Sequence, residues 1–141
     1  MDVKIKKLNP NAVIPTYAKP GDAAMDLTAI SHEYKDGNHI YGTGLAIEIP
    51  EGYVGLVFPR SSNRKTDAYM TNHVGIIDSG YRGEIMITYK NRDYDYYKPP
   101  YYKNDRIAQL MIVPYPHIEL IEVKELSETE RGTGGHGSTG R

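Results

Sequence analysis

Short runs in which every second residue is large and apolar constrain this chain more than any other feature of its sequence. Such alternation occurs over residues 45–49 and again over 54–58, with the turn-forming Pro50-Glu51-Gly52 between them. Alternation of this kind is typical of strands that bury one face, whereas helices repeat about every 3.6 residues. We therefore expect the two runs to pair as a hairpin within an all-β fold, either a sandwich or a small barrel.

Three more runs predict strands, and little of the chain predicts helix. Residues 85–89 alternate, residues 107–113 are apolar except for one Gln, as in a strand buried on both faces, and residues 118–123 form a last apolar run. The one helix that we expect is a turn or two long and starts near residues 61–62, where two Ser hydroxyls suit an N-cap. Residues 93–104 are rich in Tyr and contain a Pro pair, so they should leave the sheet as a loop.

Length and composition narrow the classes of function. With 141 residues the chain is long enough for one domain with one core. A formal net charge of -1 argues against broad nucleic-acid binding and favours a small anionic ligand held by local groups. The absence of Cys excludes a disulfide framework, a thiolate metal site and a Cys nucleophile. There is neither a signal-peptide pattern nor an apolar run of membrane length, so we expect a cytoplasmic protein, in a host cell if it is phage-encoded.

The last residues differ in composition from the rest of the chain. From residue 127 onward large apolar side chains vanish and Gly dominates, so we divide the chain into a β domain, 1–126, and a flexible tail, 127–141. Within the tail, Arg131 offers a forked charge, and the glycines let backbone N–H groups approach an anion closely. A Walker loop is excluded because the tail lacks the Gly-Lys-Ser/Thr end of that motif. The tail is therefore either a phosphate wrap or an ordinary flexible terminus.

Two inner segments place polar groups at the ends of predicted strands. Pro59-Arg60-Ser61-Ser62 lies where a strand ends and a helix begins, so its hydroxyls and N–H groups could meet a phosphate; an ordinary helix cap is the alternative. In the segment 72–83, Asp78 and Tyr81 occupy a tight turn between two apolar strands and could point into a pocket. The alternative there is a hairpin in which Asp78 only satisfies the turn geometry.

Two further polar residues lie inside apolar or small-residue runs. Gln109 interrupts an apolar strand, and a buried amide needs partners, which could be backbone groups or a ligand phosphate. Asp26 follows the run Ala23-Ala24-Met25, where a carboxylate at a turn or strand edge is the alternative to a functional one. Each of the two residues, taken alone, is compatible with a structural role and with a functional one.

Taken together, five segments of the chain resemble the five sequence motifs of the trimeric dUTPase family, in that family's order. They are AAMDL, PRSS, NHVGIIDSGYRGEI, NDRIAQL and RGTGGHGSTG. The resemblance implies a jelly-roll-like β-barrel that hydrolyses dUTP to dUMP and pyrophosphate. It also implies a homotrimer whose active sites take motifs from more than one subunit, with the mobile Gly-rich tail closing over a neighbour's site. Nucleic acid and membrane are not among the implied partners.

The resemblance also assigns roles to individual residues. It implies that Asp78 is the general base for the water that attacks the α-phosphorus, and that Tyr81 packs on the deoxyribose and leaves no room for a 2′-hydroxyl. Asn72, together with backbone near Met86, would bind the uracil edge. The implied substrate-binding residues are Arg60, Ser61, Ser62, Asn72, Gly75, Tyr81, Met86, Gln109, Arg131, His136, Gly137 and Ser138.

Mg²⁺ is the implied cofactor, held mainly by the triphosphate, and the chain indeed lacks a dense carboxylate cluster. Asp26 would act on the ion indirectly, through its water shell. Two positions depart from the family's usual pattern. His136 stands where Phe more often stacks on uracil, and Asn104 stands where Gly commonly precedes the Asp-Arg pair. Since His is also planar and Asn tolerates left-handed backbone, neither change should abolish the chemistry.

Two other functions stay open at the level of the sequence. A dCTP deaminase of the same superfamily would need a Glu in the strand that follows the Asp78 turn, and residues 85–89 contain none. A regulatory role of a phage-type dUTPase, exerted by binding a protein partner, is compatible with intact Asp78, Tyr81 and Arg131. The sequence indicates neither such a partner nor the role of the Tyr-rich loop, 94–102.

Overall fold

The computed structural model describes residues 1–93 and 98–137. These residues form ten β-strands and one 3-10 helix. In chain order the elements are β1 (Lys4–Lys7), β2 (Met25–Thr28), β3 (Ser31–Lys35), β4 (Asn38–Gly42), β5 (Leu45–Glu48), β6 (Tyr53–Pro59), η1 (Ser61–Lys65), β7 (Ala68–Met70), β8 (Gly75–Ile77), β9 (Met86–Asn91) and β10 (Arg106–Pro114). The helix of this described part, η1, is far too short to span a lipid bilayer.

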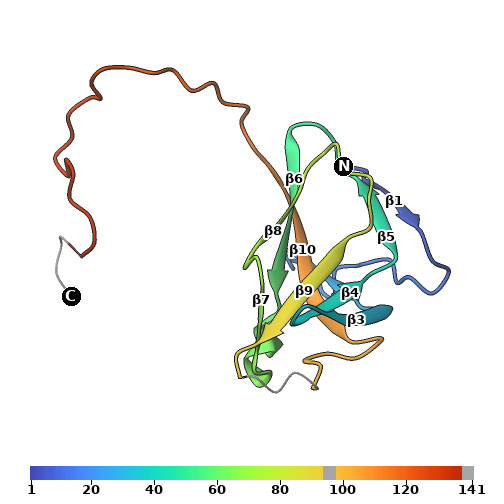
Figure 1. The fold of residues 1–141 in the computed structure, drawn as a ribbon. Helices are drawn as coiled ribbons and strands as arrows, with labels where there is room; N and C mark the ends of the chain where they lie inside the picture. The colour runs from blue at the N-terminus through green and yellow to red at the C-terminus, as the bar shows by residue number, and fades with distance from the viewer. Residues whose placement is uncertain (94–97, 138–141) are drawn as a thin grey trace.

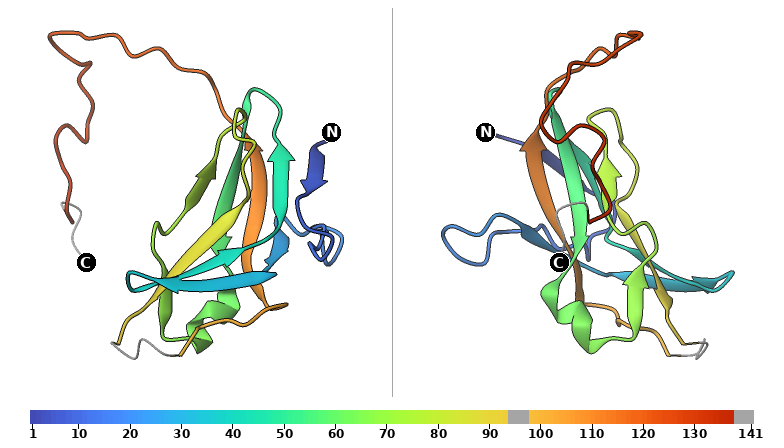
Figure 2. Two further views of the ribbon diagram at one scale, coloured as in Figure 1. Left: turned by 45° about the vertical axis from the view of Figure 1, so that its right-hand side comes forward. Right: turned by 90° about the vertical axis from the view of Figure 1, so that its left-hand side faces the viewer.

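The strands form three antiparallel sheets. One four-stranded sheet has the order β2-β10-β6-β8, the other has the order β3-β4-β9-β7, and β1 pairs with β5. The two larger sheets face each other across a shared core, with the β1–β5 pair at one side (Figures 1 and 2). The all-β, jelly-roll-like fold expected from the sequence is confirmed.

The strands β5 and β6 do not form the hairpin that their alternation predicted. The turn Pro50-Glu51-Gly52 does reverse the chain, since the Tyr53 N–H donates to the Pro50 carbonyl at 3.1 Å. However, β5 pairs with β1, and β6 lies between β10 and β8 in another sheet. A period of two gives each strand a buried face, but it does not select the strand that lies alongside.

The hairpin of β3 and β4 lies outside the alternating runs identified in the sequence. Asp36 and Gly37 form its two-residue turn, and both have positive φ angles, 50° and 77°, as such turns require. Asp-Gly between two strands is among the strongest short-range hairpin patterns. The sequence therefore carried the information for this hairpin in its turn residues.

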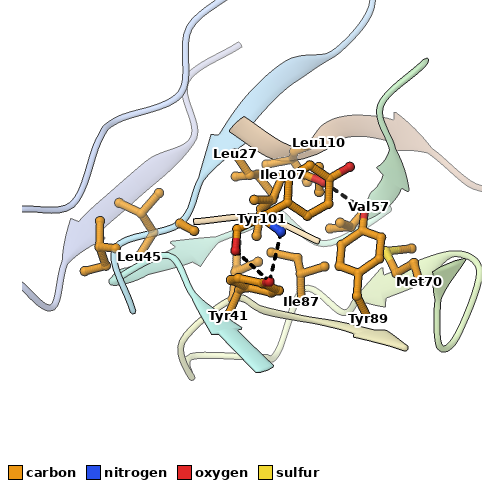
Figure 3. Packing of buried hydrophobic residues seen from close by; sticks show 14 of the residues in the cluster. Leu27, Tyr41, Leu45, Val57, Met70, Ile87, Tyr89, Tyr101, Ile107 and Leu110 are labelled. Atoms are coloured by element: carbon orange, nitrogen blue, oxygen red, sulfur yellow. Dashed lines mark hydrogen bonds between the residues drawn. The ribbon is translucent and has the colours of Figure 1, made fainter. Parts of the chain in front are cut away.

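The core contains tyrosines as well as aliphatic residues. The rings of Tyr41, Tyr89 and Tyr101 pack edge to face, with centroids 5.1 to 6.3 Å apart. The Tyr41 hydroxyl donates to the Tyr101 carbonyl at 2.9 Å, and the Tyr89 hydroxyl donates to the Ile107 carbonyl at 2.8 Å (Figure 3). Burial raises the pKa of Tyr41 to about 12, so its phenol remains a neutral donor. Because Tyr101 belongs to the Tyr-rich loop, at least this residue of the loop serves packing.

The last strand, β10, is mostly buried over residues 107–110 and only partly buried after them. Ile107, Ala108 and Leu110 are fully buried between the neighbouring strands β2 and β6. Residues 111–113 are only partly covered. The prediction that residues 107–113 are buried on both faces therefore holds for 107, 108 and 110 and is wrong for 111–113.

Residues 118–123 do not form the strand predicted from their apolar character. They belong to an arm that leaves the barrel after β10 and runs away from it (Figures 1 and 2). Leu120 and Ile121 are 90% and 77% exposed. The apolar side chains of residues 118–123 are therefore more than half exposed within the described part of the chain.

The short helix predicted near residue 61 is present as η1, but its cap differs from the expectation. The N-cap residue is Arg60, and no side chain caps the helix. Instead, the Asn63 side chain ties the helix to its surroundings, because its Oδ1 accepts the Tyr101 hydroxyl at 2.8 Å and its Nδ2 donates to the Ala68 carbonyl at 3.0 Å. The helix is thus fixed by tertiary contacts.

The segment between β9 and β10 is a loop, as predicted, over its described residues. Residues 98–105 contain no strand, and 94–97 lie outside the described residues. Asn104 adopts a φ of 74°, the left-handed backbone expected for a position where Gly would also fit.

Candidate active site

A pocket of about 280 Å³ lies where strands of both four-stranded sheets meet the loop after β8. Its apolar wall comes from both sheets, and its polar groups come from the turns on either side of β8. The lining residues are Val57, Met70, Asn72, Gly75, Ile76, Ile77, Asp78, Tyr81, Glu84, Met86 and Ile87. The pocket thus brings together the predicted site residues Asn72, Gly75, Asp78, Tyr81 and Met86.

Asp78 follows β8 directly, and its side chain is exposed at the pocket. The Tyr81 N–H donates to the Asp78 carbonyl at 3.0 Å and closes a tight turn. No donor among the described residues is hydrogen-bonded to the Asp78 carboxylate. A carboxylate that is exposed in this way can accept a proton from a bound water, which is the property that a general base needs.

The turn after Asp78 does not connect two paired strands. β8 pairs with β6, whereas β9 pairs with β4 and β7, so residues 78–85 cross from one sheet to the other. The hairpin alternative for this segment is therefore wrong. Because the loop crosses between sheets, its side chains reach the pocket that both sheets line.

Tyr81 lies across the neighbouring Gly83. Its hydroxyl donates to the Glu84 carbonyl at 2.9 Å. A Cβ at Gly83 would come within 2.5 Å of the Tyr81 ring atom Cζ, so this ring position requires Gly there. The Tyr81 side chain remains 44% exposed, which leaves ring surface available to a ligand.

Asn72 lies in the turn between β7 and β8. The Val74 N–H donates to its carbonyl at 2.6 Å, and His73 between them has a φ of 59°. A Cβ at Gly75 would lie only 3.2 Å from the Val57 Cβ, so Gly lets β8 approach β6 closely. The turn therefore places an amide side chain beside a narrow apolar pocket, a combination that suits a planar polar base.

A second group of predicted residues surrounds Asp26 on β2. The Arg60 Nε donates to the Asp26 Oδ1 at 2.7 Å, and an Arg106 Nη1 lies 3.4 Å from the Oδ2. Arg60 also donates to the Ser62 Oγ at 3.1 Å, next to the exposed Ser61. Asp26 is thus an ion-pair partner of two arginines, and the arginines and hydroxyls together offer donors to an anionic ligand.

Gln109 lies opposite Asp26 in the register of β10 and β2. Its Nε2 donates to the Pro59 carbonyl at 3.0 Å. Of the two kinds of partner expected for this amide, backbone groups or a ligand phosphate, the structure thus shows a backbone group. Gln109 and Asp26 line a separate pocket of about 360 Å³, and neither lines the pocket of Asp78. The predicted phosphate-binding residues of the barrel therefore lie apart from the predicted general base within one chain.

The predicted tail residues lie apart from both groups. The tail extends away from the barrel in Figure 1 and in the left view of Figure 2, and its described residues are almost all exposed. Within it the Arg131 Nε donates to the Gly134 carbonyl at 2.9 Å, and His136 and Gly137 have φ angles of 51° and 87°. Ser138 lies outside the described residues. A single chain thus holds the predicted site residues in three separate places.

Glu84 and Arg106 are the charged residues of these groups that the sequence analysis did not single out. The Glu84 Oε1 accepts the Gly44 N–H at 2.7 Å, and its carbonyl holds Tyr81. Glu84 could have been recognised in the sequence as a charged residue between a Gly-containing turn and an apolar strand. Arg106 could have been recognised as a second Arg, besides Arg60, that directly follows Asp105 at the start of β10.

The histidines of the β3–β4 hairpin do not add a metal centre. His32 Nε2 and His39 Nδ1 lie 3.0 Å apart, and Asn91 lies on the other side of His39. Burial, and secondly the neighbouring His32, lower the pKa of His39 below its ordinary value of 6.5. The described residues contain no group of three or more His, Asp or Glu side chains that could hold a metal ion.

Proteins of known function resemble this chain over nearly its whole length. A family model described as dUTPase matches residues 10–140. The deoxyuridine 5'-triphosphate nucleotidohydrolase of Nautilia profundicola is 45% identical over 144 residues, which cover 100% of both chains. That of Nocardia farcinica is 41% identical over 143 residues, which cover 98% of this chain and 85% of the relative.

Solved structures of dUTPases also resemble this chain in fold. A point mutant of the dUTPase of Staphylococcus bacteriophage 80alpha, solved with dUpNHpp, superimposes with a TM-score of 0.85 at 30% identity, and the match covers 99% of each chain. A point mutant of the dUTPase from phage phi11 of S. aureus, whose structure describes the coordination of a structural Mg(II) ion, has a TM-score of 0.74 at 28% identity over 89% of this chain and 98% of the other. In both cases the similarity extends beyond any single motif.

Proposed function

We propose, since this chain belongs to the dUTPase family and is a dUTP nucleotidohydrolase, that Asp78 is the general base of its reaction. The Asp78 carboxylate takes a proton from a water molecule, and the water oxygen attacks the α-phosphorus of dUTP. The bond between the α-phosphorus and the bridging oxygen then breaks. The products are dUMP and pyrophosphate.

The contrast between the two carboxylates of the pocket carries this proposal. The Glu84 Oε1 already accepts the Gly44 N–H, whereas the Asp78 carboxylate is exposed and has no hydrogen-bond donor among the described residues. A general base must reach the proton that it removes, directly or through one water. Asp78 meets this condition, and Glu84 is occupied in holding the fold.

The apolar pocket beside Asp78 suits the nucleoside part of the substrate. We assign the uracil edge to Asn72 and to backbone near Gly75 and Met86, which line the pocket. Tyr81 then packs on the deoxyribose, where the bulk of its ring leaves no room for a 2′-hydroxyl. This arrangement puts the α-phosphate on the side of the pocket where Asp78 lies.

The triphosphate is assigned to the second group and to the tail. Arg60, Ser61, Ser62 and Gln109 offer donors around the Asp26 pocket. The tail would close over the bound nucleotide as a lid, with His136 stacked on uracil. The tail residues that would bind the nucleotide are Arg131, His136, Gly137 and Ser138.

A homotrimer would complete these sites. In one chain the proposed base, the proposed phosphate-binding residues and the tail lie in three separate places, which supports shared sites built from more than one subunit. The arm after β10 exposes Leu120 and Ile121, which would be covered if it lay on another subunit. The lid of each site would then come from a neighbour.

Mg²⁺ fits this arrangement only as an ion held mainly by the triphosphate. The Asp26 carboxylate accepts hydrogen bonds from two arginines, but a carboxylate has about four acceptor positions, so metal-bound water can still bind there. When bound, the ion would neutralise charge on the phosphate oxygens. Asp26 would hold its water shell, and Arg60 would stay fixed beside it.

The experiment that tests the function is pyrophosphate release from purified protein offered dUTP, dCTP, dTTP and UTP in separate reactions. We expect rapid release from dUTP and much slower release from the other three nucleotides. Equal release from dUTP and UTP would contradict the assigned sugar selection. Ammonia release from dCTP would instead indicate a deaminase.

A further inference from the structure

Glu84 is bonded at both ends to parts of the molecule that are far apart in sequence. Its carbonyl oxygen accepts the Tyr81 hydroxyl at 2.9 Å, and its side-chain Oε1 accepts the Gly44 N–H at 2.7 Å. Gly44 lies between β4 and β5, on the other side of the crossing loop. The residue that holds the Tyr81 hydroxyl is therefore itself held by the β4–β5 connection.

The β4–β5 connection is fixed strongly enough to act as an anchor. The Thr43 side chain is fully buried, and its Oγ1 donates to the Ile85 carbonyl at 2.8 Å. The Ile85 N–H donates to the Leu45 carbonyl at 2.9 Å. The Thr43 N–H also donates to the Ile85 carbonyl, at 3.3 Å. With the bond from Gly44 to Glu84, four hydrogen bonds therefore join residues 43–45 to residues 84–85, directly before β9.

The space around Glu84 and Tyr81 leaves them little freedom. A Cβ at Gly42 would lie 2.6 Å from the Glu84 Oε1, so the carboxylate occupies the room that a side chain at residue 42 would take. On the other side, a Cβ at Gly83 would lie 2.5 Å from the Tyr81 Cζ and 2.9 Å from its Cε2. The carboxylate and the ring each lie against a residue that has no side chain.

We propose that Glu84 is a positioning residue for sugar selection. By fixing the carbonyl that accepts the Tyr81 hydroxyl, it holds the Tyr81 ring where a 2′-hydroxyl would collide with it. This inference rests on the proposed function, in which Tyr81 packs on the deoxyribose. It adds that rejection of ribonucleotides depends on a carboxylate whose contacts are with the β4–β5 connection.

The physical reason lies in how a steric filter works. A ring excludes a hydroxyl group only if it cannot move aside, since an aromatic side chain on a loop otherwise rotates at little cost. In Glu84→Ala the Gly44 N–H loses its acceptor. The side chain of residue 84 then no longer anchors this residue to the β4–β5 connection, so its carbonyl, which accepts the Tyr81 hydroxyl, is held less firmly. The Tyr81 ring can then move aside and admit the 2′-hydroxyl of UTP. Because dUTP has no 2′-hydroxyl, it does not require this movement and is bound nearly as before.

The experiment measures kcat/KM for dUTP and for UTP in the full-length protein. For Glu84→Ala we expect the ratio of dUTP to UTP to fall about three- to tenfold, the effect of one lost hydrogen bond on a single discrimination. Glu84→Gln keeps an oxygen that can accept the Gly44 N–H, so its ratio should stay within about twofold of wild type. Glu48→Ala, which removes an exposed carboxylate on the adjacent β5, is the matched control and should leave the ratio unchanged.

Tyr81→Ala separates failure of this inference from failure of the proposed function. If Tyr81→Ala lowers the ratio and Glu84→Ala does not, Tyr81 is the filter and Glu84 does not position it. If Tyr81→Ala leaves the ratio unchanged, the filter lies elsewhere and both assignments fall. A purely structural role of Glu84 would lower the two rates together and also leave the ratio unchanged, which would overturn the proposal.

Gly83→Ala provides a second route if Glu84→Ala does not fold. The added Cβ displaces the Tyr81 ring directly and leaves the bond from Gly44 to Glu84 intact. We expect the ratio to fall in this variant as well, with the circular dichroism spectrum of the wild type. A folded Gly83→Ala protein with unchanged selectivity would show that the ring position does not set the sugar preference.

Discussion

Arg60 and Asp26, which are 34 residues apart in the sequence, form a charge-assisted hydrogen bond of 2.7 Å between Nε and Oδ1. Only 23% and 26% of their side-chain surfaces are exposed. Arg60 also donates to the Ser62 Oγ, so its guanidinium group is held between the Asp26 carboxylate and the Ser62 hydroxyl. Bonds between charged groups are shorter and stronger than neutral ones, which makes this contact the natural anchor of the proposed phosphate site.

Asp26→Ala should therefore weaken substrate binding more than turnover. Without its carboxylate partner Arg60 loses its fixed orientation, and we expect KM for dUTP to rise about three- to tenfold, the scale of one partly screened ion pair. Steady-state kinetics at saturating Mg²⁺ would measure this. The control is Glu48→Gln, which breaks the exposed Lys4–Glu48 pair and should leave KM unchanged. An unchanged KM in folded Asp26→Ala would contradict the role given to Arg60.

Asp78→Asn should leave a folded protein that binds the nucleotide but turns it over slowly. A positioned general base typically contributes about 10² to 10⁴-fold, and an amide cannot take the proton. Single-turnover hydrolysis of dUTP, together with the affinity for a non-hydrolysable analogue, would separate chemistry from binding. Asp36→Asn, in the β3–β4 turn, is the matched control and should retain full activity. Normal turnover by Asp78→Asn would refute the assignment.

Truncation after Glu130 should remove activity without unfolding the barrel. The deleted segment begins at Arg131, and the described part of it contributes no residue to the core. We expect the thermal midpoint and the oligomeric state to stay the same while kcat/KM for dUTP falls by an order of magnitude or more, about the effect of losing a closing lid. Calorimetry and pyrophosphate release would test both parts. A fully active truncated protein would show that the tail is not a lid.

His136 allows a separate test of tail closure. If its ring stacks on uracil, His136→Phe should retain activity, because Phe offers at least as much planar apolar surface. His136→Ala should lower kcat/KM about three- to tenfold, the typical value of one aromatic contact. The exposed His117 in the arm gives the matched control, His117→Ala, which we expect to behave as wild type. Wild-type kinetics for His136→Ala would make residue 136 a bystander.

The buried His39 should make the stability of the fold depend on pH. Burial and the nearby His32 lower its pKa below the ordinary 6.5, so the unfolded chain binds this proton more readily than the folded one. The stabilising contribution is therefore complete above about pH 6.5 and is lost as the pH falls through that value toward the lower folded pKa. Tyr34 and Asn91 contact the same ring. A further pocket of about 360 Å³ is lined by His39 together with the charged residues Asp36, Lys90, Arg92 and Asp93.

We expect His39→Gln to flatten the loss of thermal stability between about pH 7.5 and 5, whereas the wild type and a His117→Gln control lose stability in parallel. Thermal unfolding followed by circular dichroism at several pH values would measure the difference. Equal pH dependence of His39→Gln and the wild type would show that His39 takes up no proton on unfolding in this range.

The sequence predicted the strands from their alternation but not their partners. The runs at 45–49 and 54–58 contain the strands β5 and β6, yet these lie in different sheets, because β5 pairs with β1 whereas β6 pairs with β10 and β8. The apolar run at 118–123 resembles a core strand but lies in the exposed arm. Apolar character indicates a need for burial, and it does not say whether the same chain provides it.

The sequence by itself determined that the fold is all-β, that the tail has no large apolar side chains to contribute to a core, and that Asp78 and Tyr81 lie on one turn, because each of these follows from residues close together in the chain. Only the tertiary structure decided that this turn crosses between two sheets, that Asp26 is paired with Arg60 and Arg106, and that Glu84 joins Tyr81 to Gly44. These contacts connect residues that are up to 80 positions apart. Local patterns record propensity and periodicity, whereas such pairings depend on which distant surfaces pack together when the core forms.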